Sequence, residues 1–434
     1  MICLNYFIIN CKILKISLII FKIYLNRINK NICMMNIECE NIENDNIKTI
    51  SSWEDETLNL KDNLLRGIYS YGFEKPSSIQ KKALIPFIYG KNGTRTDIIA
   101  QAQSGTGKTG AFVVGSLQIL DETKKEPQIL ILAPTHELAR QIKSVVDALG
   151  NYMKISSLLL VGGTSVDSNK MDIQSIKPQV IVGTPGRVHD IIRRKYLNPK
   201  TLSLLVLDEA DEMLSSGFKE QMSKILQYMP EDIHVGLFSA TLSDELLEMT
   251  KSFMRKPIKI LVKNEELTLQ GISQYYINLN DDSEKYETLK DIFASLTISQ
   301  SIIYCNSTRR VDDLEEAMLE DNFPVKKIHG KMSSEERKKT HKDFKSGSCR
   351  VLITSDLFSR GIDVQQVSVV INFDIPKSEF TYLHRIGRSG RWGRKGMAIN
   401  FQTKYDVMKL KKFEDFYNTT IEEMPADFAK DLNA

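Results

Sequence analysis

The sequence has few cysteines and none of the cysteine patterns that bind a metal or build a disulfide framework. Its six cysteines among 434 residues form no Cys-x-x-Cys pair and show no zinc-ligand spacing, so we expect buried or bystander thiols in a reducing compartment. The chain also has no low-complexity tract and no short-period repeat, which excludes a repeat architecture. A hydrophobic content of 42% is ordinary for a globular protein.

A hydrophobic run long enough to span a membrane is also missing. Residues 1–33 are rich in Ile, Leu, Asn and Lys, and three lysines interrupt the apolar stretch. A signal peptide or membrane anchor is therefore less favoured than an upstream extension. In that case translation would start at Met34 or Met35, and the residues before it would be either a translated extension or no part of the protein. Residues 36–52 are polar and acidic, so we expect residues 1–52 to be a disordered or non-native extension.

A strong net charge is absent as well. The formal charge is +3, and residues 1–34 contribute five basic residues and no acidic one. The remainder of the chain therefore holds 53 basic and 55 acidic residues. Without a general basic field, any contact with nucleic acid has to come from a local groove.

What the sequence does contain is two series of short apolar segments, in a chain long enough for two domains. The segments alternate with helical patterns, which is typical of parallel sheets covered by helices on both faces. The first series of expected strands lies at residues 97–100, 128–132, 157–161, 179–182, 204–208 and 235–239. The second lies at residues 274–279, 301–305, 325–329, 350–354, 367–373 and 396–401. We predict an α/β fold with domains at 53–256 and 273–434 and a linker at 257–272.

A glycine-rich loop follows the first expected strand. It consists of Ala102, Gln103, Ser104, Gly105, Thr106, Gly107, Lys108 and Thr109. The glycines let backbone N–H groups turn inward around a phosphate, and the following helix adds the positive end of its dipole. Lys108 can then reach the outer phosphates, and the Thr109 hydroxyl suits Mg²⁺. The alternative is a glycine turn with a chance Lys-Thr pair, because the general pattern has glycine in place of Ala102.

Another expected strand, at 204–208, ends in two adjacent carboxylates. Asp208 and Glu209 would stand at the carboxyl edge of the sheet, where ligands of open α/β folds bind. Asp208 could hold a metal ion, and Glu209 could orient or deprotonate a water molecule aimed at the terminal phosphate. Acids after a strand are also a common solvated helix start. Together with Lys108, the catalytic interpretation is favoured.

Three arginines lie within seven residues in the second half of the chain, at Arg385, Arg388 and Arg391. Guanidinium groups clamp phosphate through paired donors. If both domains close on one nucleotide, Arg388 and Arg391 become arginine fingers. The alternative is a basic surface loop. Residues 355–363 similarly end a strand with acids and an arginine, where a ribose or an RNA phosphate could sit.

Three turns in the first half each follow an expected strand, at Pro134–Leu138, Gly162–Gly163 and Thr184–Arg187. Hydroxyls, glycine N–H groups and one arginine suit a sequence-independent track along a nucleic-acid backbone. Each turn alone is more often an ordinary turn or helix cap. Their repetition at equivalent sheet edges favours the track.

Together these motifs resemble those of the DEAD-box RNA helicases. Asp208–Asp211 spells the name of that family, Gly72–Gln80 resembles its adenine-reading Q motif, and Ser239–Thr241 resembles the element that couples hydrolysis to RNA. The resemblance runs from about Trp53 to the end of the chain. The segments that most resemble the initiation factor 4A branch and its nuclear relatives are Leu64–Tyr69 and Leu261–Leu269.

The resemblance implies two tandem RecA-like, doubly wound parallel-sheet domains that bind ATP, Mg²⁺ and single-stranded RNA. It assigns ATP to the glycine-rich loop, to Phe73 and Gln80, and to Asp363 for the ribose, with Trp53 stacking near the adenine. It assigns Mg²⁺ to Thr109 and Asp208, and hydrolysis to Lys108, Asp208, Glu209, Arg388 and Arg391. RNA contacts are expected from Pro134, Thr135, Gly163, Thr184, Gly186, Arg187 and Arg360. Coupling of hydrolysis to RNA is expected from Asp211, Ser239, Thr241 and His384.

The sequence departs from the family pattern at a few positions. His136 stands where arginine is usual, so one contact with an RNA phosphate could be weaker or pH-dependent. Asn92–Thr96 looks like a small insertion, and Trp53 stands about two residues further upstream than expected. Serines replace other residues at 334, 355 and 359. None of these changes removes a catalytic group, so we expect activity.

We therefore predict an RNA-dependent ATPase that unwinds short duplexes locally, in translation initiation or RNA remodelling. The expected protein is a monomer away from membranes, in the cytoplasm or the nucleus, with a scaffold partner of the initiation factor 4G type. The main alternative is an ATP-gated RNA clamp within a larger ribonucleoprotein complex, because the same catalytic residues serve both. A DNA helicase or a transporter ATPase is a third, weaker alternative.

Overall fold

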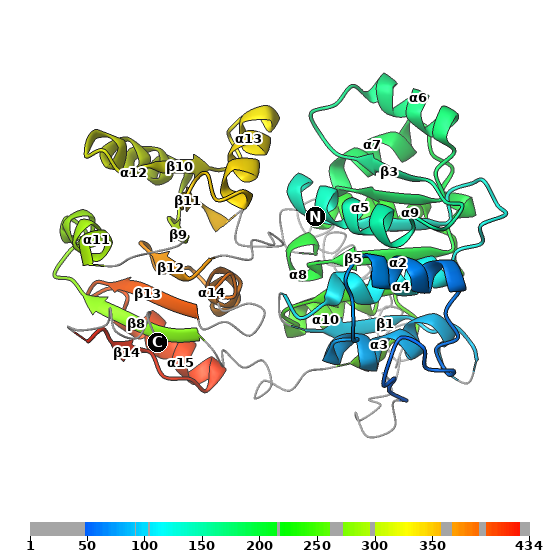
Figure 1. Cartoon of the computed structure of the whole chain (residues 1–434), viewed down its shortest axis with the longest axis horizontal. Coiled ribbons are helices and arrows are strands. Elements are labelled where there is room, and N and C mark those ends of the chain that lie inside the picture. Colours follow the sequence, from blue (N-terminus) through cyan, green and yellow to red (C-terminus); the bar gives the residue numbers. More distant parts are fainter. Residues whose placement is uncertain are drawn as a thin grey trace, which may run out of the picture. The chain divides into compact units, whose positions relative to one another are not determined.

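The computed structural model describes residues 48–91, 93–102, 105–214, 218–260, 272–295, 300–356, 367–389 and 396–425. All of them belong to one compact unit, and they form two seven-stranded parallel sheets with surrounding helices (Figure 1). Most of the predicted N-terminal extension, through residue 47, lies outside the described residues. None of the helices that the structure describes combines the length and the hydrophobicity that a membrane span requires.

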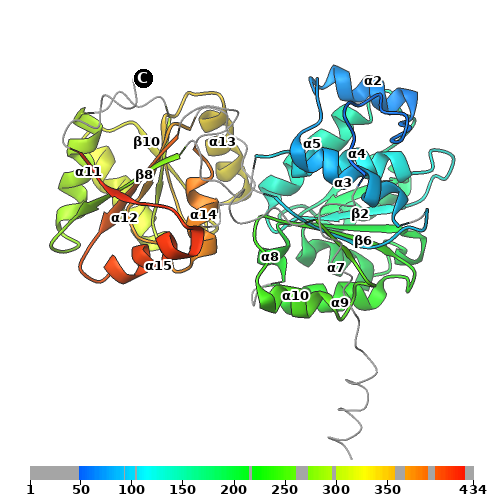
Figure 2. The ribbon, with the colours of Figure 1, turned by 90° about the horizontal axis from the view of Figure 1, so that it is seen from below.

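The first sheet has the strand order β3-β4-β2-β5-β6-β1-β7. Its strands are β1 (Ile98–Gln101), β2 (Ile129–Leu132), β3 (Ser157–Leu160), β4 (Val180–Gly183), β5 (Leu204–Asp208), β6 (His234–Ser239) and β7 (Ile258–Ile260). Its helices are α2 (Asp62–Ser70), α3 (Ser78–Tyr89), α4 (Lys108–Ile119), α5 (His136–Leu149), α6 (Val166–Ile176), α7 (Pro185–Arg193), α8 (Ala210–Met213), α9 (Lys219–Tyr228) and α10 (Asp244–Thr250), with a 3₁₀ turn at Pro199–Thr201. Helices α2 to α5 lie on one face and α7 to α10 on the other (Figure 2).

Both faces of this sheet are buried. Successive residues of a strand point to opposite faces, and in β5 Leu204 and Val206 belong to one apolar cluster while Leu205 and Leu207 belong to another. A strand covered on both faces has to be apolar throughout, without polar alternation. This is why the strands were recognisable as continuous apolar runs.

The second sheet repeats the arrangement of the first. Its order, β10-β11-β9-β12-β13-β8-β14, is the order of the first sheet with seven added to each strand number. The strands are β8 (Ile272–Asn278), β9 (Ser301–Tyr304), β10 (Val325–Ile328), β11 (Val351–Thr354), β12 (Val369–Asn372), β13 (Gly396–Gln402) and β14 (Glu422–Glu423). The helices are α11 (Glu284–Ser295), α12 (Thr308–Glu320), α13 (Ser334–Lys345), α14 (Glu379–Ile386) and α15 (Val407–Tyr417). The predicted fold class, two tandem parallel sheets, is confirmed.

The structure differs from the sequence prediction at the ends of the first domain. Residues 258–260, expected in the linker, form the edge strand β7, which pairs with β1. Ile50, expected in the disordered extension, is buried, and its N–H donates to the carbonyl oxygen of Lys81 at 3.2 Å. The second unpredicted strand is β14, of two residues. Such short segments carry too few residues for an apolar pattern to be visible.

Candidate functional site

The glycine-rich loop connects β1 to α4 at the carboxyl edge of the first sheet. Gly105 and Gly107 have φ angles of +84° and +103°, a region in which most side chains are strained. A Cβ on Gly107 would also lie 2.6 Å from the hydroxyl oxygen of Ser77. Helix α4 begins at Lys108, so the loop ends at a helix N-terminus, which favours anions. The local geometry fits a phosphate group.

Other residues of the predicted loop take clear places around it. Ala102 follows β1, and its N–H donates to the carbonyl oxygen of Ser239 on β6 at 3.0 Å. Thr106 is exposed, and Thr109 is half-buried in the first turn of α4. The loop is therefore tied to the neighbouring strand while its outer residues remain accessible to a ligand.

Gln80 and Phe73 pack directly against this loop. Gln80 is buried in α3, where its Nε2 donates to the carbonyl oxygen of Gly107 at 3.1 Å and its Oε1 accepts the Ser77 N–H at 2.7 Å. The half-buried ring of Phe73 lies 3.0 Å from where a Cβ on Gly110 would stand. Gln80 is therefore hydrogen-bonded to the glycine-rich loop itself, which the sequence did not indicate.

Trp53 does not present a ring face to a ligand. Its exposed fraction is 1%, and its ring lies nearly parallel to that of Phe73, with centroids 6.3 Å apart. A ring buried to this degree cannot stack on an adenine, so the expected role of Trp53 needs correction. Trp53 supports Phe73 from the core side, and Phe73 is the partly accessible ring of the pair.

Three charged groups gather at the ends of β5 and the loop. Lys108, Asp208 and Glu209 are 6%, 2% and 2% exposed, and Lys108 Nζ lies 3.6 Å from Glu209 Oε1. Within the described residues, Lys108 Nζ makes no hydrogen bond. Burial raises the pKa of Asp208 to about 7, with Glu209 adding to the shift and Lys108 opposing it. Buried charges are costly without partners, so this group suits a ligand that brings phosphates and a cation.

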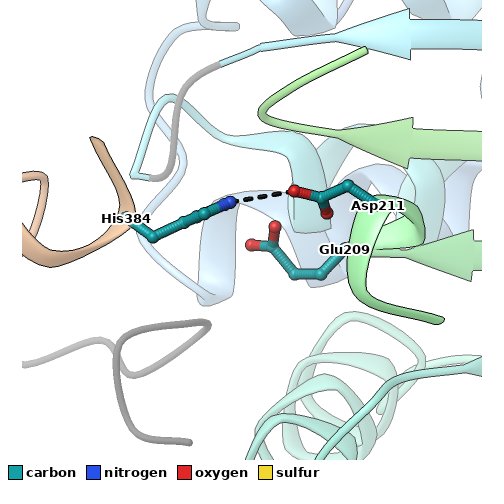
Figure 3. A group of neighbouring side chains, drawn as sticks. All are labelled: Glu209, Asp211 and His384. Atoms are coloured by element: carbon teal, nitrogen blue, oxygen red, sulfur yellow. Dashed lines mark hydrogen bonds and ion pairs between the residues drawn. The ribbon is translucent and has the colours of Figure 1, made fainter. Parts of the chain in front are cut away.

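Asp211 in α8 joins two residues from different parts of the chain. Its Oδ2 accepts a hydrogen bond from the Thr241 hydroxyl at 2.6 Å and lies 3.0 Å from His384 Nε2. The Ser239 hydroxyl oxygen accepts the Thr241 N–H at 3.4 Å. Figure 3 shows His384, from α14, pointing toward Asp211 with Glu209 beside them. The four residues expected to couple RNA to hydrolysis thus lie together.

This group also differs from the expected metal ligands. One ligand atom each from Glu209, Asp211 and His384 lies within 4.8 Å of the others, so the three could in principle share a metal ion. The expected metal ligands, Thr109 and Asp208, are not among them. Because Asp211 Oδ2 already serves Thr241 and His384, the arrangement is better explained as a hydrogen-bonded link between the two sheets.

The structure separates the arginines that the sequence grouped together. Arg385 is fully buried, and its donors bind Asp356, Asn306 and the carbonyl oxygen of Asp374 at 2.6 to 2.7 Å. These bonds fasten α14 to the ends of β9, β11 and β12. Arg388 is 2% exposed, and its Nε donates to the carbonyl oxygen of His384 at 3.1 Å. Arg388 therefore follows directly from the helix that reaches Asp211, whereas Arg385 is structural.

The strand order divides the carboxyl edge of the first sheet into two halves. The nucleotide-type residues follow β1, β5 and β6, which are neighbours in the sheet, and the three predicted RNA turns follow β3, β4 and β2, which are also neighbours. Arg187 in α7 ties two of these turns together, donating to the Thr164 hydroxyl at 2.9 Å and to the Thr164 carbonyl oxygen at 2.8 Å. The edge can therefore hold two different ligands side by side.

The predicted RNA residues are unequally accessible in this half. Gly163 and Gly186 are exposed, Thr135 and Arg187 are partly buried, and Pro134 and Thr184 are buried. Thr135 caps α5 by accepting the Leu138 N–H at 3.2 Å. Exposed glycines allow a backbone to approach closely, whereas the buried residues shape the turns.

A charged cluster that the sequence did not single out lies beside His136. Arg337 of α13 is 3.4 Å from Glu137 Oε1 through Nη1 and 3.5 Å from His136 Nδ1 through Nη2. Arg140 Nη1 is 3.9 Å from the same Glu137 oxygen. Burial lowers the pKa of His136, with Glu137 opposing the shift and Arg337, Arg140 and Arg187 adding to it. The only sequence signal was the residue type of Glu137 and Arg140, one turn apart on α5.

Five predicted site residues lie outside the described residues. They are Gln103, Ser104, Arg360, Asp363 and Arg391. Their expected roles stay predictions.

Known proteins with similar sequences and structures are helicases. The chain matches the DEAD/DEAH box helicase family over residues 77–249 and the helicase conserved C-terminal domain over residues 284–393. Eukaryotic initiation factor 4A of Drosophila melanogaster is 53% identical over 384 residues, which cover 87% of this chain and 94% of that protein. The Caenorhabditis elegans factor is 50% identical over 382 residues, covering 88% and 93%. The structure of S. cerevisiae Dbp5 bound to RNA and ADP BeF3 matches with a TM-score of 0.81 and 34% identity, covering 87% of this chain and 97% of that one.

The two matching sheets, with the glycine-rich loop in the first, define a core of tandem RecA-like helicase domains. The chain belongs to the DEAD/DEAH box helicase family. It is an ATP-dependent RNA helicase similar to eukaryotic initiation factor 4A and, accordingly, an RNA-dependent ATPase.

Proposed function

We propose that this helicase opens short RNA duplexes locally, using ATP bound at the phosphate loop and RNA bound along the adjacent half of the same sheet edge. The contact between His384 of α14 and Asp211 of α8, at 3.0 Å, carries the proposal. It brings an element of the second sheet to the acids at the end of β5. ATP turnover can therefore respond to the position of the second domain.

The residues at the loop fit ATP and Mg²⁺. Lys108 is buried among carboxylates with no hydrogen bond from Nζ among the described residues, so an outer phosphate would complete its surroundings. Bound Mg²⁺ would neutralise phosphate charge from a position near Thr109 and Asp208. Glu209 would orient or deprotonate the attacking water molecule, and Phe73 would cover the adenine. Arg388 would stabilise charge that develops on the terminal phosphate.

The RNA ligand, the protein partner and the cellular role are also part of the proposal. Exposed Gly163 and Gly186 and partly buried Thr135 and Arg187 would bind RNA phosphates without reading the base sequence. We propose a role in translation initiation in the cytoplasm, with a scaffold of the initiation factor 4G type, because the chain is 53% identical to an initiation factor 4A. The RNA clamp remains the alternative, since its catalytic residues would be the same.

The proposed function predicts that single-stranded RNA accelerates ATP hydrolysis by the full chain and that DNA of the same sequence does not. Strand separation of a short RNA duplex should require ATP. Steady-state phosphate release and a gel-based unwinding assay measure the two activities. Stimulation by RNA without strand separation, together with slow RNA release in ATP, would favour the clamp. Equal stimulation by DNA would contradict RNA specificity.

His136 provides a second prediction. Replacing His136 with arginine adds a permanent charge beside the predicted RNA turns, so RNA binding in the presence of an ATP analogue should tighten. The slope of log K against log salt should steepen by about 0.7, the value for one phosphate contact with a single strand. Fluorescence anisotropy at several salt concentrations measures the slope.

The position of Arg337 suggests how His136→Arg could instead weaken RNA binding. Arg337 Nη2 lies 3.5 Å from His136 Nδ1, so an added charge that faces Arg337 would weaken RNA binding through repulsion between the two sheets' elements. Weaker binding with an unchanged salt slope would place residue 136 at that contact and not on RNA. His136→Gln, which has no charge at any pH, is the matched control.

A further inference from the structure

A pocket of about 440 Å³ lies at the amino edge of the first sheet. We call it the amino-edge pocket. Its lining comes from the segments that precede β1, β5, β6 and β7, whereas the phosphate loop and the predicted RNA turns follow the strands at their other ends. The charged and titratable residues of its lining are Arg95, Asp97, Lys200, Asp232, His234 and Arg255. The proposed ATP and RNA sites use none of them.

The buried carboxylate of Asp97 joins three of the segments that line this pocket. It is 1% exposed, and its two carboxylate oxygens accept the N–H groups of Val235 at 2.9 Å and Arg255 at 2.6 Å. The guanidinium of Arg255 donates to the carbonyl oxygen of Ile233 and lies 4.0 Å from Asp97. Both Asp97 oxygens are thus used for the backbone, and Arg255 is fixed in the wall.

Two further cations of the pocket have no ion-pair partner within the part of the chain that the structure describes. They are the exposed residues Arg95 and Lys200. Arg95 lies in the small insertion relative to the family pattern that the sequence indicated. Hydrogen bonds of Thr96 hold the turn there. The Thr96 hydroxyl accepts the Lys91 N–H at 3.2 Å and donates to the carbonyl oxygen of Thr94 at 3.0 Å. The insertion therefore holds a cation at the pocket.

His234 adds a neutral, buried polar group. It is 5% exposed, and its Nε2 has no hydrogen-bond partner among the described residues, while Nδ1 lies 3.6 Å from Asp97. Burial and the positive charges of Arg95 and Arg255 lower the pKa of His234 to about 4. A buried polar group without a partner costs free energy, and an anion in the pocket would relieve this cost by favouring the protonated ring, in which both nitrogens are donors.

We propose that the amino-edge pocket binds a phosphate-bearing anion. Arginine and lysine clamp phosphate oxygens, and three cations line this pocket against the exposed Asp232 and the internally bonded Asp97. The volume is many times the ~30 Å³ of a water molecule, so it can hold more than one phosphate group. The pocket binds its ligand independently of the proposed ATPase mechanism.

The test uses the full-length protein saturated with ADP and Mg²⁺, so that the phosphate loop is filled, and inorganic pyrophosphate as the probe. The histidine ring signals are followed by NMR, with His234 identified through His234→Gln. Pyrophosphate should shift the His234 signal saturably and raise its pKa, because the anion offsets the positive charges of Arg95 and Arg255. Arg95→Ala and Lys200→Ala should each weaken binding about tenfold, since each removes a charged hydrogen bond.

Lys219→Ala is the matched control, because Lys219 is exposed in the same domain outside the pocket. It should bind pyrophosphate normally. An unmoved His234 signal, or unchanged affinity in Arg95→Ala, would overturn the proposal. Displacement of pyrophosphate from His234 by a short RNA would identify RNA backbone as the natural source, and its failure to displace would identify a free phosphate compound. RNA-stimulated ATPase should be normal in Arg95→Ala, so the two proposals can fail separately.

Discussion

Replacing Arg388 with alanine is expected to lower RNA-stimulated ATP hydrolysis about 10³-fold or more, the usual loss for an arginine finger. Arg388 follows α14, whose His384 reaches Asp211 beside Glu209. It can therefore stabilise phosphate charge that develops in the transition state only when the second domain is in place. ATP affinity without RNA should change only a few-fold. RNA affinity with an ATP analogue should fall, because two ligands coupled through one closure affect each other equally.

The control for this prediction has to separate chemistry from folding, because Arg388 is 2% exposed. Arg388→Lys keeps a charge but loses the paired donors, and it should remain strongly impaired while unfolding at a normal temperature. Arg309→Ala removes an exposed arginine of the same domain and should hydrolyse ATP normally. Near-normal hydrolysis in a folded Arg388→Ala variant would place this arginine outside the active site and contradict the two-domain mechanism.

Replacing Glu209 with glutamine should reduce turnover by about 10² to 10⁴, the usual range for a general base. Glutamine keeps the size and most hydrogen bonds but cannot take a proton from water. Glu209 has a φ of +50°, and its N–H donates to Asp208 Oδ1 at 3.0 Å, so its side chain is placed by a strained backbone that either residue type can keep. ATP and RNA should still bind together, measured as RNA anisotropy in the presence of ATP.

Two observations would argue against this role for Glu209. Loss of ATP binding together with turnover would mean that the carboxylate serves mainly as the partner of Lys108, 3.6 Å away. Unchanged turnover would mean that another group positions the water molecule. Glu245→Gln, on the exposed side of α10, is the matched control and should behave as the unmodified protein.

The contacts of the Q motif could not be predicted from its sequence. The motif was recognisable because Gln80 follows a fixed spacing from Phe73, but nothing in that spacing shows that Gln80 bonds to Gly107 of the phosphate loop. The aromatic type of Trp53 suggested stacking on adenine. Its burial behind Phe73 is a property of packing, which depends on residues distant in the chain.

The arginines show the same limit in the second domain. Arg385 and Arg388 have the same side chain and lie three residues apart in sequence, and the sequence assigned a role to Arg388 and Arg391 without indicating what Arg385 binds. Only the placement of α14 against the ends of β9, β11 and β12 shows that the guanidinium donors of Arg385 are hydrogen-bonded to internal partners. The contact of Arg337 with Glu137 was likewise invisible, because the two residues are 200 positions apart.

The strand segments, the glycine-rich loop and the two acids after β5 could be predicted from the amino-acid sequence of this protein. These are local features, since burial on both faces forces continuous apolar runs and phosphate binding requires small residues beside a helix start. The order of the strands became visible only in the folded chain, and with it the division of one sheet edge between the group β1, β5 and β6 and the group β3, β4 and β2. It also brought His384 to Asp211, 173 residues away. Such pairings depend on how helices and strands pack in space, and no local spacing encodes them.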